Sequence, residues 1–346
     1  MSEPFSLSVV IPNRNRADLL LRAVLSVQDQ TADAIEIIVV DDFSRTDLSA
    51  EYAMLEEMGV RILRQPRHQR GPAARNRGAR EARGSHVSFL DSDDIWLSGR
   101  YDEIRSFYAD PKNGERVLVS HAAIHIDGEL RDIAQPVWHA GASLVEYVYR
   151  DAGRVQTSML TMPVSLAHRF PFDETLRVNQ DTDLAMRMDR AGIGFEIATV
   201  PTLVKDETPD PGRLTMGRET ADLSYDWFRR ESHDWSRAAK SGYHLQDRVW
   251  RLADSGRRGA AYASLARSLF PPVSARESAR RGVGMVLGQG GYETLRGAVR
   301  KLRGDPALAR DGGEMLARWN RLDRRAREIC AALQDAAGGE DAAPDP

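Results

Sequence analysis

The sequence contains a single cysteine, Cys330, among 346 residues. One thiol excludes an intramolecular disulfide and any metal site built from several cysteines, and it suits a reducing compartment. The chain also lacks an N-terminal leader pattern and any apolar run of the roughly 18 residues that a membrane-spanning helix needs. We therefore expect a cytoplasmic protein that is neither exported nor integral to a membrane, with the inner face of the membrane as an alternative location.

Two common nucleotide-binding loops are missing from the sequence. No Gly-x-Gly-x-x-Gly follows the first apolar segment, and no Gly-x-x-x-x-Gly-Lys-Ser/Thr occurs anywhere, so a dinucleotide-dependent dehydrogenase and a phosphate-loop enzyme are disfavoured. The loop after Ile11 reads Pro-Asn-Arg-Asn-Arg, and its lack of glycine also argues against a sugar nucleotidyltransferase. The net charge of −3 gives the chain no overall basic character, and no nucleic-acid partner is expected.

Apolar β-type runs and helical periodicity alternate along the first part of the chain. Strands are predicted over residues 7–11, 35–40, 60–63 and 87–90, separated by helices over 17–28, 48–58 and 73–82. Further strands are predicted over 117–126, 155–162 and 195–200, with a helix over 180–191. The fold class expected is α/β, with a doubly wound, mixed but mostly parallel sheet flanked by helices. Ligands bind beyond the carboxyl ends of the strands in such sheets.

Strand signals disappear after about residue 210. Helices are predicted over 221–240, 245–253, 258–269, 273–286, 292–303 and 314–333, and a small, acidic tail follows. The expected organisation is a nucleotide-sugar-binding and catalytic domain over 1–210, an all-helical C-terminal region over 211–334 and a disordered tail over 335–346. Lys and Arg outnumber Asp and Glu in the helical region. Acceptor contacts, a homo-oligomer interface and peripheral membrane contact remain alternatives for it, and Trp227, Trp235 and Trp250 fit an interfacial helix or ordinary core and rim positions.

A buried strand ends in three carboxylates, Asp91, Asp93 and Asp94. Carboxylates this close repel one another, so one of them keeps its proton or a cation lies between them. Oxygen-only ligands favour Mg²⁺ or Mn²⁺. The alternative is a solvated acidic turn, and Asp94 could instead cap a following helix that Ile95 and Trp96 would begin.

Four segments together resemble the family 2 glycosyltransferases of the GT-A fold, of the inverting type that builds bacterial cell-surface glycans. These segments are Val9–Asn15 (VVIPNRN), Ile38–Ser44 (IVVDDFS), Gly71–Gly78 (GPAARNRG) and Phe89–Trp96 (FLDSDDIW). They occur in the family's order, and the resemblance covers about residues 6 to 205. A stretch from Phe172 to Leu184 is similar to the family's acceptor-side segment, with Gln180 in place of the usual Glu.

The resemblance implies roles for the residues of the nucleotide-sugar site. Pro12 and Asn13 are expected to line the nucleotide pocket, and Asp42 to accept the imide N–H of a uracil or thymine base or the edge of a guanine. Arg75 is expected near the diphosphate, where a guanidinium offers two parallel donors. Asp42 as a polar strand end and Arg75 as a surface residue of a basic helix remain the alternatives.

The same resemblance implies the metal ligand and the catalytic base. Asp91 is expected to bind the ribose or to reach the metal through water, and Asp93 to bind Mn²⁺ or Mg²⁺ directly. Asp181 matches the base that accepts the proton of the acceptor hydroxyl, although it could also be a carboxylate placed favourably at a helix N-terminus. Arg213 and Arg218 are candidates for closing over the diphosphate.

The function predicted is therefore that of a metal-dependent inverting glycosyltransferase of the hexosyltransferase type. It would move a sugar from a nucleoside diphosphate sugar, UDP-linked, to a hydroxyl of a glycan or lipid-linked acceptor in cell-surface polysaccharide synthesis. The alternative is a non-catalytic docking module that keeps the same fold. Such a module has no need of Asp93 or Asp181.

Overall fold

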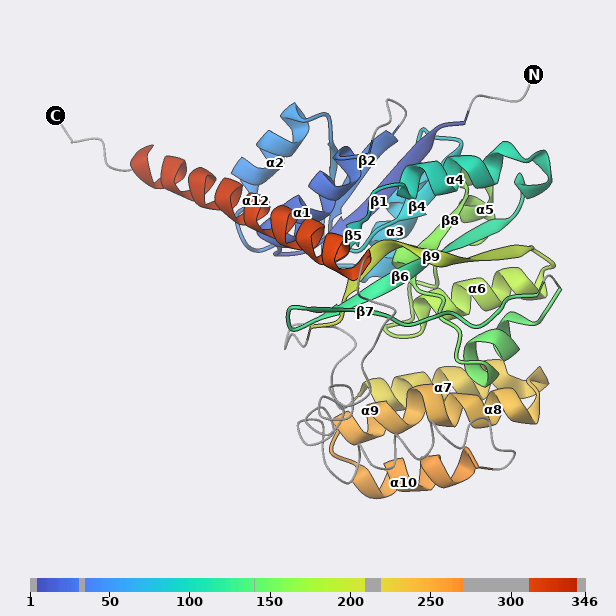
Figure 1. The fold of residues 1–346 in the computed structure, drawn as a ribbon. Helices are drawn as coiled ribbons and strands as arrows, with labels where there is room; N and C mark the ends of the chain where they lie inside the picture. Colours follow the sequence, from blue (N-terminus) through green and yellow to red (C-terminus); the bar gives the residue numbers. More distant parts are fainter. Residues whose placement is uncertain (1–4, 31–34, 140, 209–218, 270–310, 341–346) are drawn as a thin grey trace.

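The computed structural model describes residues 5–30, 35–139, 141–208, 219–269 and 311–340. Their strands form one twisted sheet (Figure 1) with the order β3-β2-β1-β4-β8-β6-β9-β5, and β7 pairs with β6 at its side. The strands are β1 Leu7–Asn13, β2 Ile35–Asp41, β3 Arg61–Arg64, β4 His86–Phe89, β5 Ile95–Trp96, β6 Val117–Ile126, β7 Glu129–Asp132, β8 Leu160–Pro163 and β9 Phe195–Asp206. The first four run parallel, whereas β8 runs antiparallel to β4 and β6. The mixed, mostly parallel α/β sheet predicted from the sequence is confirmed.

Helices cover the sheet and carry the apolar faces that the periodicity predicts. They are α1 Ala17–Gln28, α2 Ser49–Glu57, α3 Arg70–Glu81, α4 Arg100–Ala109, α5 Val164–Arg169 and α6 Gln180–Arg190, with short turns of other helix types at η1 Pro111–Asn113, η2 Glu146–Arg150 and η3 Thr157–Met159. In α1 the spacing of Leu20, Leu21 and Val24 puts three fully buried side chains on the sheet face. The bounds of α1 and β6 are those expected from the sequence.

One local expectation is wrong. Ile95 and Trp96 do not begin a helix but form β5, which pairs antiparallel with Leu203 and Val204 of β9. Both side chains are completely buried, and α4 begins only at Arg100. A buried two-residue strand and the apolar start of a helix look alike in sequence, and the partner strand more than a hundred residues away decides between them. Asp94 therefore caps no helix.

A helical unit follows the sheet and lies beneath α6 in Figure 1. It comprises α7 Thr220–Glu231, η4 Ser232–Asp234, α8 Arg237–Tyr243, η5 His244–Arg248, α9 Val249–Asp254 and α10 Arg258–Arg267. Trp227 and Trp235 are buried in its aromatic core, so these two are core residues and not an interfacial surface. The helices expected over 273–286 and 292–303 lie outside the described residues.

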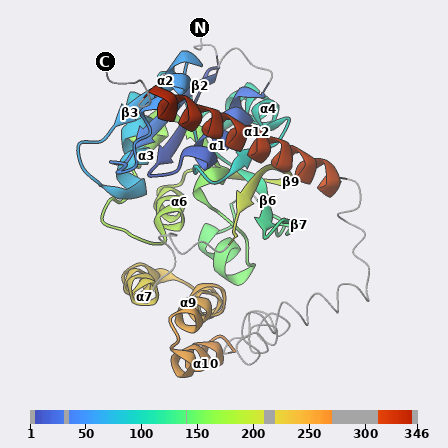
Figure 2. The same ribbon diagram turned by 90° about the vertical axis from the view of Figure 1, so that its left-hand side faces the viewer.

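The C-terminal helix α12, Asp311–Glu340, returns to the sheet. Figures 1 and 2 both show it crossing α1 and α2, and Trp319, Leu322, Ala326 and Cys330 belong to the same apolar core as the sheet. Residues 335–340 are helical, which differs from the disordered tail expected from residue 335, and 341–346 lie outside the described residues. None of the helices described is both long and apolar enough to cross a membrane.

Candidate active site

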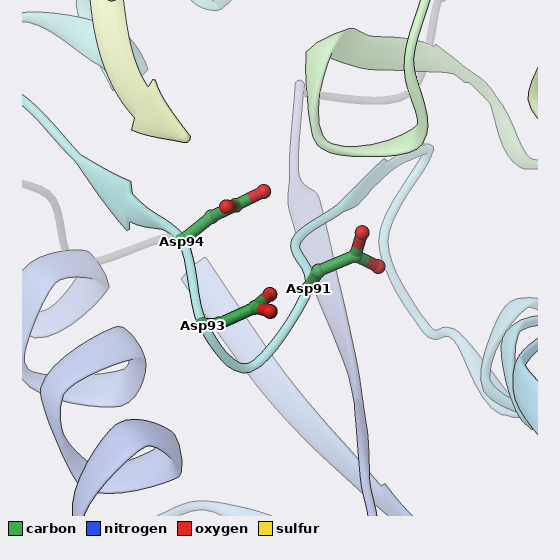
Figure 3. A group of neighbouring side chains, drawn as sticks. All are labelled: Asp91, Asp93 and Asp94. Atoms are coloured by element: carbon green, nitrogen blue, oxygen red, sulfur yellow. The ribbon is translucent and has the colours of Figure 1, made fainter. Parts of the chain in front are cut away.

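The loop after β4 brings three carboxylates together at the carboxyl edge of the sheet. Oxygen atoms of Asp91, Asp93 and Asp94 lie within 4.8 Å of one another, and Figure 3 shows the three side chains on one tight loop. The main chain of Leu90 still donates to Val10 of β1, at 3.0 Å, and the amide of Asp94 closes the turn onto the carbonyl oxygen of Asp91, also at 3.0 Å. The sequence prediction of an acidic cluster at the end of a buried strand is confirmed.

The carboxylate of Asp94 is held by other groups of the protein. Its carboxylate is fully buried and accepts from Ser158 Oγ at 2.5 Å, from Lys205 Nζ at 2.7 Å and from the amide of Asp206 at 3.0 Å. Burial raises the pKa of Asp94, Lys205 counteracts this, and Asp93 and Asp91 add to the rise. Because three donors already use its lone pairs, Asp94 joins the loop to the end of β9 and offers little to a ligand.

Arg75 joins the carboxylate loop to the start of α6. Its Nη2 donates to Asp91 Oδ1 at 2.5 Å, and its Nη1 donates to Gln180 Oε1 at 3.0 Å. Burial alone would raise the pKa of Asp91, but the charges of Arg75 and Lys205 outweigh it and hold the pKa below its usual range. Asp91 is therefore an ionised carboxylate in the structure, and its side chain remains 26% exposed.

Asp93 is held by two arginines from the segment after β1. Arg16 Nη1 lies 3.1 Å from Asp93 Oδ2, and Arg22 Nη2 donates to the backbone oxygen of Asp93 at 2.6 Å. The side chain of Asp93 is 19% exposed. Unlike Asp94, Asp93 therefore presents a carboxylate edge from which solvent is not excluded.

Asp181 lies in the first turn of α6, directly after Gln180. Its Oδ1 accepts from the amide of Thr182 at 2.8 Å. Burial raises the pKa of Asp181 above its ordinary value, and the charges of Arg75 and Lys205 oppose that rise only partly. A carboxylate with a raised pKa is the kind of group that accepts a proton at moderate pH.

Asp42 lies at the end of β2 and is saturated with donors. Its Oδ1 accepts from Gln65 Nε2 at 3.0 Å and from the amide of Gln69 at 2.7 Å, and its Oδ2 accepts from the amide of Arg70 at 2.7 Å. His68 Nδ1 lies 2.7 Å from the same Oδ2. Asp42 thus organises the turn that leads into α3, and His68, with 32% of its side chain exposed, is its most accessible partner.

Pro12 and Asn13 lie at the end of β1, next to β2. Asn13 is buried, donates through Nδ2 to the Tyr52 hydroxyl at 3.1 Å, and accepts the amide of Asp42 on its backbone oxygen at 2.8 Å. Its side-chain Oδ1 is buried without a hydrogen-bond partner among the described residues. The fold therefore brings Pro12, Asn13, Asp42, Arg75, Asp91, Asp93 and Asp181 to one edge of the sheet.

Several charged residues of this site were missed by the sequence analysis. Lys205, Arg16 and Arg22 all contact the carboxylate loop. A single signal for Lys205 was available, because it is the first charge after the apolar run Leu203-Val204. Arg213 and Arg218, expected near the diphosphate, lie outside the described residues.

The donor set fits a hard divalent cation. It contains carboxylate oxygens and neither thiol nor imidazole, which is the preference of Mg²⁺ and Mn²⁺. Asp93 and Asp91 are the partly exposed members, so these two would hold the ion.

Comparison with known proteins places the first third of the chain in one family. Residues 8–135 match the family described as Glycosyl transferase family 2. The amylovoran biosynthesis glycosyltransferase AmsB of Erwinia amylovora is 29% identical over 205 residues, which cover 57% of this chain and 68% of AmsB. A Campylobacter jejuni protein named GalNAc(5)-diNAcBac-PP-undecaprenol beta-1,3-glucosyltransferase is 40% identical over 96 residues, 27% of this chain and 31% of that protein. Against two Rickettsia glycosyltransferases the chain spans 35% of the relative's length.

The fold is shared with a solved structure. Residues 1–349 of TarS from S. aureus, in complex with UDP-GlcNAc, superpose with a TM-score of 0.55 over 80% of this chain and 92% of that chain. At 14% sequence identity this likeness concerns the fold alone.

Proposed function

Since this chain belongs to the family 2 glycosyltransferases, we propose that it transfers a sugar from a UDP-linked donor to a hydroxyl of a cell-surface glycan or a lipid-linked acceptor. The names of two relatives support this choice of acceptor, because one is described by amylovoran biosynthesis and the other by an undecaprenol-linked glycan. The observation that carries the proposal is the Arg75 bridge, which ties Asp91 of the carboxylate loop to Gln180 at the start of α6. It joins the donor side of the site to the helix that presents Asp181.

The nucleoside would lie over the ends of β1 and β2. Pro12 and Asn13 would line its pocket. The Oδ1 of Asn13 has no hydrogen-bond partner among the described residues, which supports a role in accepting a hydrogen bond from a bound molecule. For Asp42 to accept the imide N–H of uracil, one of its present donors has to leave. His68 is the donor that a base would replace, because the others are backbone amides and the buried Gln65.

The diphosphate would lie beside Asp91, Asp93 and Arg75. Asp93 and Asp91 would hold Mn²⁺ or Mg²⁺, which when bound neutralises the charge that develops on the leaving diphosphate. Arg75 keeps Asp91 ionised and oriented through its 2.5 Å contact. Lys205 holds the opposite end of the loop through Asp94.

The acceptor hydroxyl would approach Asp181. A carboxylate oxygen of Asp181 would take the proton of the acceptor hydroxyl while the hydroxyl oxygen attacks the anomeric carbon of the donor sugar. The attack comes from the face opposite the leaving UDP, whose bond to that carbon breaks, so the configuration is inverted. The raised pKa of Asp181 supports its assignment as the base.

The organisation of the rest of the chain forms part of the same proposal. Residues 1–210 would bind the nucleotide sugar, and the helical residues after them would supply acceptor contacts, subunit contacts or contacts with the membrane surface, in the cytoplasm or at the inner face of the membrane.

The test is a calorimetric and thermal-shift screen of UDP, GDP, dTDP, CDP and ADP with Mn²⁺, Mg²⁺ or a chelator. Wild type, Asp93→Ala and Asp102→Ala are compared, because Asp102 is an exposed carboxylate of α4 outside the loop. We expect UDP to stabilise wild type and Asp102→Ala only with metal, and Asp93→Ala not at all. Metal-independent binding would remove the metal from the proposal, and no binding of any diphosphate would favour the docking-module alternative.

A further inference from the structure

We propose that α12 braces the metal-binding loop, with Trp319 and Asp323 acting as positioning residues that hold Arg22 against the main chain of Asp93. This inference rests on the proposed metal-dependent function, because it concerns the geometry that the loop offers to the cation. It assigns a role in the site to a helix whose sequence lies more than two hundred residues after the loop.

Arg22 is the link between α12 and the loop. Its Nη2 donates to the backbone oxygen of Asp93 at 2.6 Å, although Arg22 itself belongs to α1. Its guanidinium lies 3.8 Å from the centre of the Trp319 ring, and its Nη1 lies 3.2 Å from Asp323 Oδ1. The Arg22 side chain is only 3% exposed, so these partners fix one rotamer of a buried cation.

A second route connects the same tryptophan to the loop. The His125 ring stacks on Trp319 with centroids 4.2 Å apart, and its Nδ1 lies 3.3 Å from Asp206 Oδ1. Asp206 in turn donates its backbone amide to Asp94 Oδ1 at 3.0 Å. Trp319 therefore supports Asp93 through Arg22 and Asp94 through His125 and Asp206.

The far end of the loop is also tied to α12. Arg318 Nε donates to the backbone oxygen of Trp96 at 3.2 Å, and its Nη2 donates to that of Ser26 at 3.3 Å. Arg318 thus contacts the main chain just after the carboxylates directly, and Trp319 reaches the carboxylate loop through Arg22 and His125. Both links end on main-chain oxygens, that of Trp96 for Arg318 and that of Asp93 for Arg22, so the helix acts on the position of the main chain.

Metal affinity is sensitive to such outer contacts, because a ligand that is free to move has to be ordered when the ion binds. Without Trp319, Arg22 loses its stacking partner and the support of Asp93 is weakened. The loop would then be free to depart from the coordinating geometry while its ligands remain chemically intact.

The experiment titrates MnCl₂ into the full chain, with and without UDP, and follows binding by calorimetry. Outer-contact mutations typically cost roughly 10- to 100-fold in metal affinity, and we expect a loss in this range for Trp319→Ala. Trp319→Phe keeps a ring beneath Arg22 and is expected to recover most of the affinity. Leu322→Ala is the matched control, because Leu322 is a buried residue of the same helix that packs in the apolar core. It should lower Tm while leaving the Mn²⁺ affinity within about twofold of wild type.

Amide hydrogen exchange gives a second readout that needs no metal. In Trp319→Ala the amide of Asp94 should exchange faster than in wild type, and in Leu322→Ala it should not. Wild-type Mn²⁺ affinity in Trp319→Ala, or equal exchange at Asp94 in both variants, would overturn the brace. If wild type binds no Mn²⁺, the metal proposal fails, and the exchange at Asp94 alone supports or overturns the brace.

Discussion

Individual cations decide how the acidic loop is arranged. Arg16 contacts Asp93 and Arg75 contacts Asp91, whereas Lys205 lies 2.7 Å from Asp94 and 3.8 Å from Asp91. Each cation also comes from a different element, and together they join the ends of β1, α3 and β9. The contacts that neutralise the charge of the loop therefore also fix its position.

The Arg75→Lys variant should distinguish the effect of the positive charge from that of the two simultaneous hydrogen bonds. A lysine keeps the positive charge but cannot donate to Asp91 and Gln180 at once, as the two Nη atoms of Arg75 do. Losing one charge-assisted hydrogen bond of about 2 kcal/mol lowers kcat/KM roughly 30-fold. Steady-state kinetics of UDP-sugar transfer measure this, with Arg77→Lys on the same helix as the control. Equal kinetics in both variants would exclude the bridge as a catalytic requirement.

Protonation of Asp181 should set the acid limb of the profile of activity against pH. The base works only when ionised, and burial raises its pKa, so activity should be lost as the pH falls through a value above the ordinary pKa of aspartate. An acid limb no higher than an ordinary aspartate pKa would contradict the assignment.

Asp181→Asn should raise the stability of the protein and lower its activity. The raised pKa means that the ionised form is disfavoured in the folded state, and this cost is present at neutral pH and disappears on acidification. Asparagine removes the charge, so we expect a higher Tm at pH 7 together with a loss of activity of roughly 10²- to 10⁴-fold. Thermal melts at pH 7 and pH 4 should show the Tm difference shrinking at the lower pH.

The sequence indicated the acidic residues of the site better than the basic ones. Asp91 and Asp93 stand beside a local strand, and their spacing is visible in a few residues. Lys205 and Arg22 reach the loop only because β9 and α1 fold beside it, and their neighbours in sequence do not show which residues they will contact. Side-chain partners separated by a hundred residues follow from topology and not from local pattern.

At the scale of elements, periodicity located most helices and strands because each buries one continuous apolar face. It failed where burial came from a distant partner, as for β5, and for the half-exposed β7, which the sequence analysis did not anticipate. The strand β9 continues through Asp206, beyond the predicted end at 200, because β6 and β5 pair with its second half.

The packing of α3 on β1 can be tested with glycine substitutions of opposite expected sign. A Cβ at Gly78 would lie 2.3 Å from Val10 Cγ1, so Gly78→Ala should destabilise the fold by about 1–3 kcal/mol. Gly259 of α10 is exposed with no atom within 4 Å of such a Cβ, and Gly259→Ala should stabilise by about 0.5–1 kcal/mol. Denaturant titration measures both, and a neutral Gly78→Ala would mean that α3 shifts freely on the sheet.

The contact between α7 and α6 links the helical unit to the helix that carries Asp181. Trp227 Nε1 donates to the buried Asp183 at 3.0 Å. Trp227→Phe keeps most of the ring but leaves that carboxylate oxygen without this donor, at a cost of about 1–3 kcal/mol. We expect a lower denaturation midpoint and a lower kcat, with nucleotide affinity unchanged. Trp235→Phe is the control, because its indole nitrogen has no hydrogen-bond partner among the described residues.

At the scale of the whole molecule, the order of segments along the chain differs from their grouping in space. The sequence analysis assigned residues 314–333 to the helical region, and the helix there is confirmed, but its buried residues pack into the core of the sheet. An amphipathic pattern shows that a helix has an apolar face and does not show which surface covers it.

A chain ending at residue 310 should therefore have a less stable sheet, because it lacks residues that belong to the core of the sheet. Trp319 and Leu322 are each 3% exposed, and losing their burial removes roughly 3–6 kcal/mol from a total stability of about 5–15 kcal/mol. We expect a large fall in Tm and aggregation. A chain ending at residue 340 keeps all of α12 and should melt like the full chain. Equal melting of all three would show that α12 contributes nothing to the core.

The return of α12 also sets an order of events during translation. Residues 5–208 leave the ribosome before α12 covers α1, and Arg22 has neither Trp319 nor Asp323 beside it until residues 311–340 have followed. At about 5–20 residues per second, those later residues arrive several seconds after β9. A nascent chain therefore carries all the strands of the sheet before it carries the helix that supports the carboxylate loop, so the rate of elongation sets when the loop gains that support.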